Sequence, residues 1–181
     1  MGEQYRRTPR ARFLDYEEGM YFVTICTKDR VHYFGRICED MMCLSEIGEF
    51  LSTQLQKATD YFCDVEVPLF VVMPNHLHAM VLVKNHREEH AVKGQRDFLK
   101  VRTPNPLQRP DETCQRHVPT LCRYVNSLKG AVTKFAKAND MQFGWQPRFH
   151  DHLIRDNHEC ELITDYIQNN VARWARDCFN M

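Results

Sequence analysis

Two histidines separated by one apolar residue stand at the start of an apolar run, Met73-Pro-Asn-His-Leu-His-Ala-Met-Val-Leu-Val83. Side chains alternate between the faces of a β-strand, so His76 and His78 point to one face and Leu77 points to the other. Two imidazoles on one face can reach a single divalent cation, and imidazole suits Mn²⁺, Co²⁺, Ni²⁺ or Zn²⁺ better than Mg²⁺. The pair is therefore a candidate metal site on the exposed face of a half-buried strand. The same spacing is also compatible with two solvated polar residues.

A second pair with this spacing, His150-Asp-His152, also lies in a strand-like segment. It lacks the long apolar context of the first pair, and Asp151 would have to point to the other face of the sheet. We therefore rank it second as a metal site. One of its histidines can instead support a metal ligand or contact a phosphate.

A tyrosine and an asparagine near the end of the chain are candidates for the reacting groups. Tyr166 and Asn170 are four residues apart on a helix predicted for 159–175, so they share a face. A tyrosine hydroxyl can attack phosphorus and form a covalent intermediate, and an asparagine carbonyl can be a third metal ligand. Alternatively, Tyr166 completes an apolar stripe and Asn170 lies near the helix end. Tyr124 competes as nucleophile, although Leu128 occupies the position where a polar partner would be expected.

Apolar periodicity predicts the elements that must position these side chains. Short runs of β-branched and aromatic residues indicate strands, and apolar residues at helical spacing, in one case after a Ser45 cap, indicate helices. The predicted strands are 21–27, 62–67, 69–73, 77–83 and 149–154, and the predicted helices are 45–60, 120–138 and 159–175. We therefore expect an α+β fold of the ferredoxin-like split βαβ type, with an antiparallel sheet covered by helices on one side.

The composition bounds the class of protein. The 181 residues are 43% hydrophobic and 27% charged, as is typical of a soluble globular domain. No stretch approaches the ~20 consecutive apolar residues of a membrane span, and the charged N-terminus does not look like a secretory signal. We expect a single domain over residues 1–181, in the cytoplasm and without a membrane partner. None of the eight cysteines forms a C-x-x-C pair, so neither zinc nor disulfides are expected.

The charge distribution bears on nucleic-acid binding. The formal net charge is zero, which argues against a protein that coats nucleic acid by bulk electrostatics but permits a local basic groove. The N-terminal arginines either contact phosphates or form a solvated arm. Residues 84–119 are rich in charge and proline, and we expect a flexible insertion there because this composition cannot bury enough apolar area to fold alone.

Together, these motifs resemble those of the HUH single-tyrosine transposases, nearest to the REP-associated tyrosine transposase branch. The resemblance extends over most of the chain. Its most specific part is the Met-Pro-Asn-His-Leu-His string at 73–78, followed by Tyr-Ile-Gln-Asn-Asn at 166–170. The other matching strings are 21–27, 127–130 and 145–155.

The resemblance implies a ferredoxin-like transposase domain that cleaves single-stranded DNA and transfers the strand. Carried over position by position, His76 and His78 would bind a divalent metal ion, Mg²⁺ or Mn²⁺, and Asn170 would complete the metal site. Tyr166 would attack a phosphodiester, which produces a 5′-phosphotyrosine and a free 3′-hydroxyl without ATP. The implied partner is single-stranded DNA with hairpin or palindromic repeats.

Substrate recognition and oligomeric state are less determined. The residues that we expect to contact DNA are Arg6, Arg7, Arg10, Arg12, Arg148, His152 and Arg155. The chain departs from the family pattern in its longer 84–119 segment and in Asn-Asn-Val, which replaces Asn-Pro-Val after the tyrosine. Two other functions stay open: a hydrolytic nuclease of the same fold, and a domesticated hairpin-DNA-binding protein without catalysis. The sequence does not distinguish a monomer from a homodimer.

Overall fold

The computed structural model describes residues 18–84 and 120–176. All but the first residue of the expected insertion at 84–119 lie outside these ranges. The expected DNA contacts in the N-terminal segment also lie outside them: Arg6, Arg7, Arg10 and Arg12.

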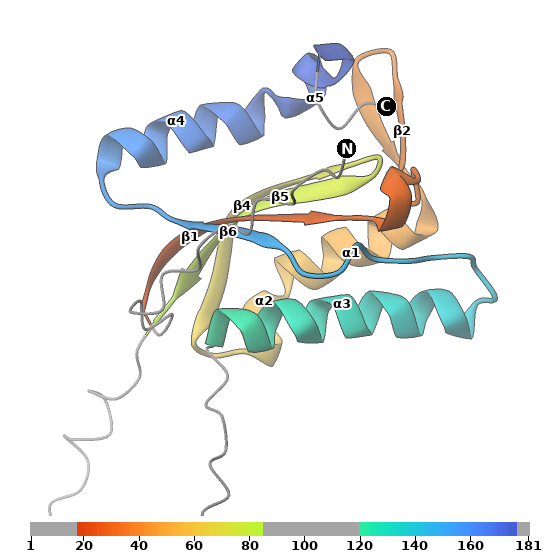
Figure 1. The fold of residues 1–181 in the computed structure, drawn as a ribbon, viewed down its shortest axis with the longest axis horizontal. Helices are drawn as coiled ribbons and strands as arrows, with labels where there is room; N and C mark the ends of the chain where they lie inside the picture. Colours follow the sequence, from red (N-terminus) through yellow and green to blue (C-terminus); the bar gives the residue numbers. More distant parts are fainter. Residues whose placement is uncertain (1–17, 85–119, 177–181) are drawn as a thin grey trace, which may run out of the picture.

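A four-stranded antiparallel sheet forms the centre of the molecule (Figure 1). Its strands are β1 (Gly19–Cys26), β4 (Val65–Met73), β5 (His76–Val83) and β6 (His150–Leu153), in the spatial order β4-β5-β1-β6. A separate hairpin pairs β2 (Gly35–Cys38) with β3 (Met41–Leu44), and the short 3₁₀ turn η1 (Lys28–Arg30) precedes it. β6 is therefore an edge strand, with β1 between it and the strand that carries the first histidine pair.

Helices lie on both faces of the sheet (Figure 1). They are α1 (Glu46–Gln56), α2 (Ala58–Tyr61), α3 (Thr120–Ala138), α4 (Asn157–Gln168) and α5 (Asn170–Arg173), followed by the 3₁₀ turn η3 (Trp174–Arg176). α1 and α3 pack on one face, whereas α4 lies on the other. The predicted α+β class is confirmed, but the expectation of helices on one side only is wrong. Within the described residues, no helix is both long enough and apolar enough to span a membrane.

The chain connections explain the strand order. β1 and β4 both run antiparallel to β5, so they are parallel to each other, with α1 in the connection between them. β5 and β6 both run antiparallel to β1, so they are also parallel, with α3 in their connection. Two interleaved βαβ units of this kind make the predicted ferredoxin-like split βαβ arrangement.

The apolar core lies between the sheet and the pair of helices α1 and α3. Alternate residues of β1 (Tyr21, Val23 and Ile25) are 1% exposed and face this core. Leu51 of α1 and Leu121 of α3 are fully buried, and both belong to the same cluster. The core therefore takes one set of alternating side chains from each central strand, and the other set lies on the face below α4.

β4 is one strand where the sequence predicts two. Pro68 interrupts the apolar run, and a strand is expected to end there because proline cannot donate a ladder hydrogen bond. The structure instead continues the strand through Pro68 with a register shift between Glu66 and Leu69. β4 is at the edge of the sheet, where a proline and a bulge are tolerated.

The start of α1 is specified locally. The Oγ of Ser45 accepts a hydrogen bond from the Gly48 amide at 3.1 Å, as predicted for a helix cap, and it donates to the Tyr33 carbonyl at 2.7 Å. A Cβ atom at Gly48 would lie 2.2 Å from the Phe34 carbonyl oxygen, which already accepts from the Ser45 amide. Gly48 is therefore required by the close approach of the preceding loop, not by its own backbone angles.

Replacing the two helical glycines by alanine should have opposite effects. Gly130→Ala in α3 meets no atom within 4 Å and should stabilise the protein by about 0.5–1 kcal/mol, because alanine restricts the unfolded chain. Gly48→Ala should destabilise it by about 1–3 kcal/mol, because the new Cβ must displace backbone. Denaturant unfolding measures both free energies, and stabilisation by Gly48→Ala would contradict the packing described here.

Candidate active site

The two histidines of the first pair lie on the face of β5 opposite the apolar core. In register, His76 is beside Cys26 of β1 and His78 is beside Thr24, whereas Leu77 points into the core. The predicted shared face is confirmed. The expectation of an exposed face is wrong, since His76 is 0% and His78 is 2% exposed. α4 covers this face (Figure 1), and the Trp174 ring lies 6.0 Å from that of His76.

His76 is held by the residue before it. Its Nδ1 lies 2.9 Å from Oδ1 of Asn75, whose Nδ2 donates to the Arg30 carbonyl at 3.2 Å. The His76 and His78 rings are 4.6 Å apart between centroids and are inclined by 68°. The Nε2 atom of His76 is buried. Asn75 thus orients one imidazole beside the other.

His78 connects three elements of the structure. Its Nδ1 lies 2.8 Å from Oγ1 of Thr24 on β1, and its Nε2 lies 3.2 Å from the hydroxyl of Tyr166 on α4. Phe22 stacks on the His78 ring at 5.2 Å and contacts Tyr166 edge-on at 6.1 Å. The proposed nucleophile and one proposed metal ligand, far apart in sequence, are therefore within hydrogen-bonding distance.

Both imidazoles are neutral at physiological pH. Burial, together with the neighbouring His78 and Arg30, lowers the pKa of His76 to about 2. Burial also lowers the pKa of His78 to about 4. A neutral imidazole has one nitrogen lone pair available, which is the state that ligation of a metal ion requires.

The sequence predicts that Tyr166 and Asn170 lie on one continuous helix, but the structure breaks this helix between them. α4 ends at Gln168, Asn169 caps it, and Asn170 begins α5. The Asn169 side chain donates to the carbonyl and the carboxylate of Asp165, and this competition with the backbone favours a helix end. Asn170 is 1% exposed, and within the described residues its Oδ1 makes no hydrogen bond.

Tyr124 is placed where it cannot compete as nucleophile. It is 3% exposed within the apolar core under α3, edge-on to Phe62, on the other face of the sheet from the histidine pair. Its hydroxyl is buried and makes no hydrogen bond with the described residues, and burial raises its pKa. A phosphate could not reach this group without opening the core.

Comparisons with known proteins agree with this arrangement. No family model matches the chain. An uncharacterized protein of Haemophilus influenzae is 32% identical over 178 residues, which cover 97% of this chain and 93% of the relative, so the two belong to one family. A second Haemophilus influenzae protein, provisionally named a REP-associated tyrosine transposase, is 26% identical over 86% of this chain and 71% of its own length.

A solved structure has a similar fold. The structure of a REP-associated tyrosine transposase bound to a REP hairpin matches 96% of this chain and 74% of its own, with a TM-score of 0.51 and 20% identity. The chain is therefore similar to REP-associated tyrosine transposases over most of its length. The relationship inferred from the two motifs is thereby confirmed.

The donors available for a metal in this transposase-like protein are limited. In the part of the chain that the structure describes, no three side chains among His, Cys, Asp and Glu converge on a possible metal position. A site at the first histidine pair therefore needs a donor of another type. The buried amide oxygen of Asn170 is such a donor, since amide oxygens can ligate divalent cations. Trp174, which follows α5, contacts His76 and so brings the end of α5 over the start of β5.

The second histidine pair lies on the same face of the sheet but at its edge. His150 is in register with Thr24 and His152 with Phe22, whereas Asp151 is beside the core residue Val23. Asp151 thus points to the other face, as the sequence predicts. Both histidines are exposed, and β1 separates them from the buried pair.

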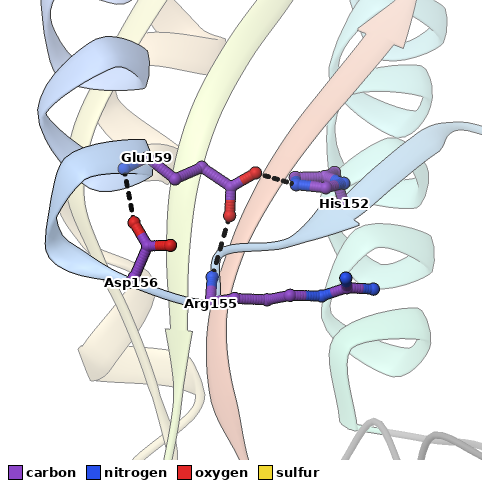
Figure 2. A network of polar contacts seen from close by, with 4 residues as sticks. All are labelled: His152, Arg155, Asp156 and Glu159. Carbon is purple, nitrogen blue, oxygen red and sulfur yellow. Dashed lines mark hydrogen bonds and ion pairs between the residues drawn. The ribbon is translucent and has the colours of Figure 1, made fainter.

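His152 takes part in a polar network that holds the start of α4 (Figure 2). Its Nε2 lies 2.6 Å from Oε1 of Glu159, and the other carboxylate oxygen accepts from the Arg155 amide at 2.9 Å. Asp156 caps the helix by accepting from the Glu159 amide at 2.8 Å. The helix that carries Tyr166 is thus attached to the edge strand at its first turn.

The two other described residues expected to contact DNA are exposed near this edge. Arg155 takes part in the network of Figure 2 through its main-chain amide, and its side chain is exposed. Arg148 precedes β6 in a left-handed conformation with φ of 69°, and its carbonyl accepts from Nζ of Lys129 at 2.9 Å. The same Nζ donates to the Gln146 carbonyl at 2.8 Å and lies over the Trp145 ring.

Several residues that contact the two histidines were not predicted as site residues from the sequence. Thr24, Phe22, Asn75 and Trp174 contact the two rings, but they occur in apolar or turn-like contexts that indicate packing. Asn75 lies inside the matching Met-Pro-Asn-His string, and Phe22 and Thr24 lie inside the matching string 21–27, so these three had a usable signal. All four become adjacent to the histidines only when the sheet pairs and α4 folds over it.

Glu159 should make the stability of the protein pH-dependent. Hydrogen bonds from the Arg155 amide and from His152 lower the pKa of Glu159 below its ordinary value of 4.5. Because the folded-state pKa is lowered, the stabilisation is present above pH 4.5 and is lost as the pH falls through the folded-state value.

The variant Glu159→Gln keeps the shape of the side chain but removes its charge. Its melting temperature should be below that of the wild type at neutral pH, and the difference should shrink under acidic conditions. Thermal unfolding followed by circular dichroism across this range measures the effect. A difference that is constant with pH would show that the ionised carboxylate does not hold the start of α4.

Proposed function

We propose that this protein is a DNA transposase that cleaves single-stranded DNA with Tyr166 and transfers the strand through a 5′-phosphotyrosine. The observation that carries the proposal is the 3.2 Å contact between the Tyr166 hydroxyl and Nε2 of His78. Two motifs that are 88 residues apart along the chain meet at this contact. The relationship to REP-associated tyrosine transposases supports the same reaction class.

The residues present suit a divalent metal ion, Mg²⁺ or Mn²⁺. His76 and His78 provide two neutral imidazoles, and Asn170 provides a buried amide oxygen that has no hydrogen bond within the described residues. A bound divalent ion would polarise the scissile phosphate and offset the negative charge of the transition state. Two nitrogen ligands and one oxygen ligand favour Mn²⁺ over Mg²⁺ in this site.

The chemical step uses Tyr166 as nucleophile. Its phenolic oxygen forms a bond to the scissile phosphorus while the bond from phosphorus to the 3′ oxygen breaks. The leaving oxygen takes up a proton to become a 3′-hydroxyl, and the phenol loses its own proton. Attack of a 3′-hydroxyl on the phosphotyrosine reverses these bond changes, so strands can be rejoined without ATP.

The position of the phenol proton depends on His78. When His78 carries its proton on Nδ1, its Nε2 can accept a hydrogen bond from the Tyr166 hydroxyl, which lies 3.2 Å away. One nitrogen lone pair serves one partner at a time, so Tyr166 must leave this nitrogen for it to ligate a cation. The Tyr166 hydroxyl is thereby held beside the proposed metal site until a cation binds there.

We infer that the DNA passes over the edge of the sheet at β6. Arg148, His152 and Arg155 are exposed there, beside the start of the helix that carries Tyr166. Since the chain has zero net charge, affinity must come from local contacts and from a structured DNA feature. The related transposase structure contains a REP hairpin, which makes a hairpin with a single-stranded flank the best substrate to test.

Covalent capture tests the nucleophile. Wild-type protein incubated with Mn²⁺ and labelled single-stranded DNA should give a denaturation-resistant adduct that maps to Tyr166 by mass spectrometry. Tyr166→Phe should give none, because it keeps the ring contact with Phe22 but lacks the attacking oxygen. Tyr124→Phe is the matched control and should form the adduct normally, since it removes only a hydroxyl buried in the core.

The outcomes separate the alternatives. Cleavage without an adduct indicates a hydrolytic nuclease of the same fold. Hairpin binding without cleavage in Mn²⁺ indicates a non-catalytic DNA-binding protein. An adduct that persists in Tyr166→Phe would refute the assignment of the nucleophile.

The DNA preference is a separate prediction. Cleavage should be fastest for a hairpin with a single-stranded flank, slower for the flank alone, and slowest for a continuous duplex. A phosphate in single-stranded DNA can bend into a site between a helix and a sheet, and unstacked bases can stack on aromatic side chains for about 1–3 kcal/mol each. The three substrates are compared at one fixed salt concentration.

The duplex is the decisive substrate in this comparison. Equal rates on all three substrates would remove the hairpin preference. Faster cleavage of the duplex would count against the proposed transposase reaction itself.

A further inference from the structure

We propose that Asn75 is a positioning residue that keeps the proton of His76 on Nδ1, so that Nε2 retains its lone pair for a divalent cation. This inference rests on the proposed function, because only that function assigns the lone pair to a metal ion. Asn75 is 0% exposed, in the turn between β4 and β5, directly before the first histidine. No base, acid or nucleophile role is involved; Asn75 acts only through the imidazole that it contacts.

The hydrogen bonds around Asn75 allow one arrangement only. A backbone carbonyl can only accept, so the contact of 3.2 Å with the Arg30 carbonyl must come from Nδ2 of Asn75. The amide oxygen of Asn75 then faces His76, where it lies 2.9 Å from Nδ1. An amide oxygen also can only accept, so Nδ1 of His76 must carry the proton.

The main chain of Asn75 is fixed independently of its side chain. Its carbonyl accepts from the amide of Thr27 at 2.9 Å, and Oγ1 of Thr27 also lies 2.9 Å from it. The amide of Phe34 donates to the neighbouring Pro74 carbonyl at 3.0 Å. These bonds attach the β4–β5 turn to the loop after β1, and the side-chain amide of Asn75 is left to orient His76.

His78 provides an internal contrast. The partner of its Nδ1 is the hydroxyl of Thr24, which can donate or accept, and the partner of its Nε2 is the hydroxyl of Tyr166. Neither contact dictates which nitrogen carries the proton. The structure therefore predetermines the tautomer of His76 and leaves that of His78 to adjust.

Nuclear magnetic resonance of the metal-free full chain reads the tautomer directly. With ¹⁵N-labelled histidine at neutral pH, the ring nitrogens of His76 should show protonation at Nδ1, with the resonances assigned from His76→Gln. Asn75→Ala removes the acceptor and should shift His76 toward the Nε2-protonated tautomer. Asn75→Asp keeps an oxygen acceptor at the same position and should retain protonation at Nδ1.

Thr27→Val is the matched structural control. It removes the hydroxyl contact with the Asn75 carbonyl but leaves the side-chain amide in place. It should lower the melting temperature without changing the His76 tautomer. If Thr27→Val changes the tautomer as much as Asn75→Ala does, Asn75 has only a structural role and the proposal is wrong.

A second readout is the affinity for Mn²⁺ alone, measured by electron paramagnetic resonance of the free ion. Asn75→Ala should weaken binding by about 10–100-fold, the usual loss when the partner of a metal-bound histidine is removed, whereas Asn75→Asp should lose less. Unchanged Nδ1 protonation in Asn75→Ala overturns the inference whatever the adduct assay gives. If the wild-type protein forms no covalent DNA adduct, the proposed function is wrong. The tautomer of His76, measured by nuclear magnetic resonance, still decides the role of Asn75 in that case.

Discussion

The burial of two imidazoles on one face of a β-sheet is the constraint on which the surrounding structure depends. Taking a polar side chain out of water is unfavourable unless its hydrogen bonds are replaced. His76 meets this requirement through Asn75, and His78 meets it through Thr24 and Tyr166. Each partner comes from a different element, so strand pairing, the β4–β5 turn and the seating of α4 all converge on the same two rings.

The two faces of the sheet therefore stabilise the protein in different ways. α1 and α3 bury apolar side chains in one cluster against one face, and burial of this kind is the dominant favourable contribution to folding. α4 has a single buried residue, Ile167, and makes polar contacts with the sheet through Glu159 and Thr164. A helix with so few buried apolar side chains should open at lower cost than the core, as the proposed reaction of Tyr166 with a large substrate requires.

The α+β class, the split βαβ arrangement and the residues on each face of the central strands could be predicted from the sequence. Short apolar runs rich in β-branched and aromatic residues predicted β1 and β5, and an apolar period of about 3.6 predicted α3, so these elements could be predicted from local pattern. The shared face of His76 and His78 followed from the alternation of side chains along a strand. The relationship to the transposases could likewise be inferred from the order of two short motifs.

The contacts among those residues, and the groups that surround them, follow from the folded arrangement and not from local sequence. Burial of the histidines depends on α4 crossing the sheet, the helix break at Asn169 depends on side-chain bonds to Asp165, and Tyr124 is excluded because α3 packs on the apolar face. The role of Asn75 depends on the carbonyl of Arg30, which is 45 residues away along the chain. Local patterns cannot encode such contacts, because the free energy of a buried polar group is set by partners that arrive only when the chain has folded.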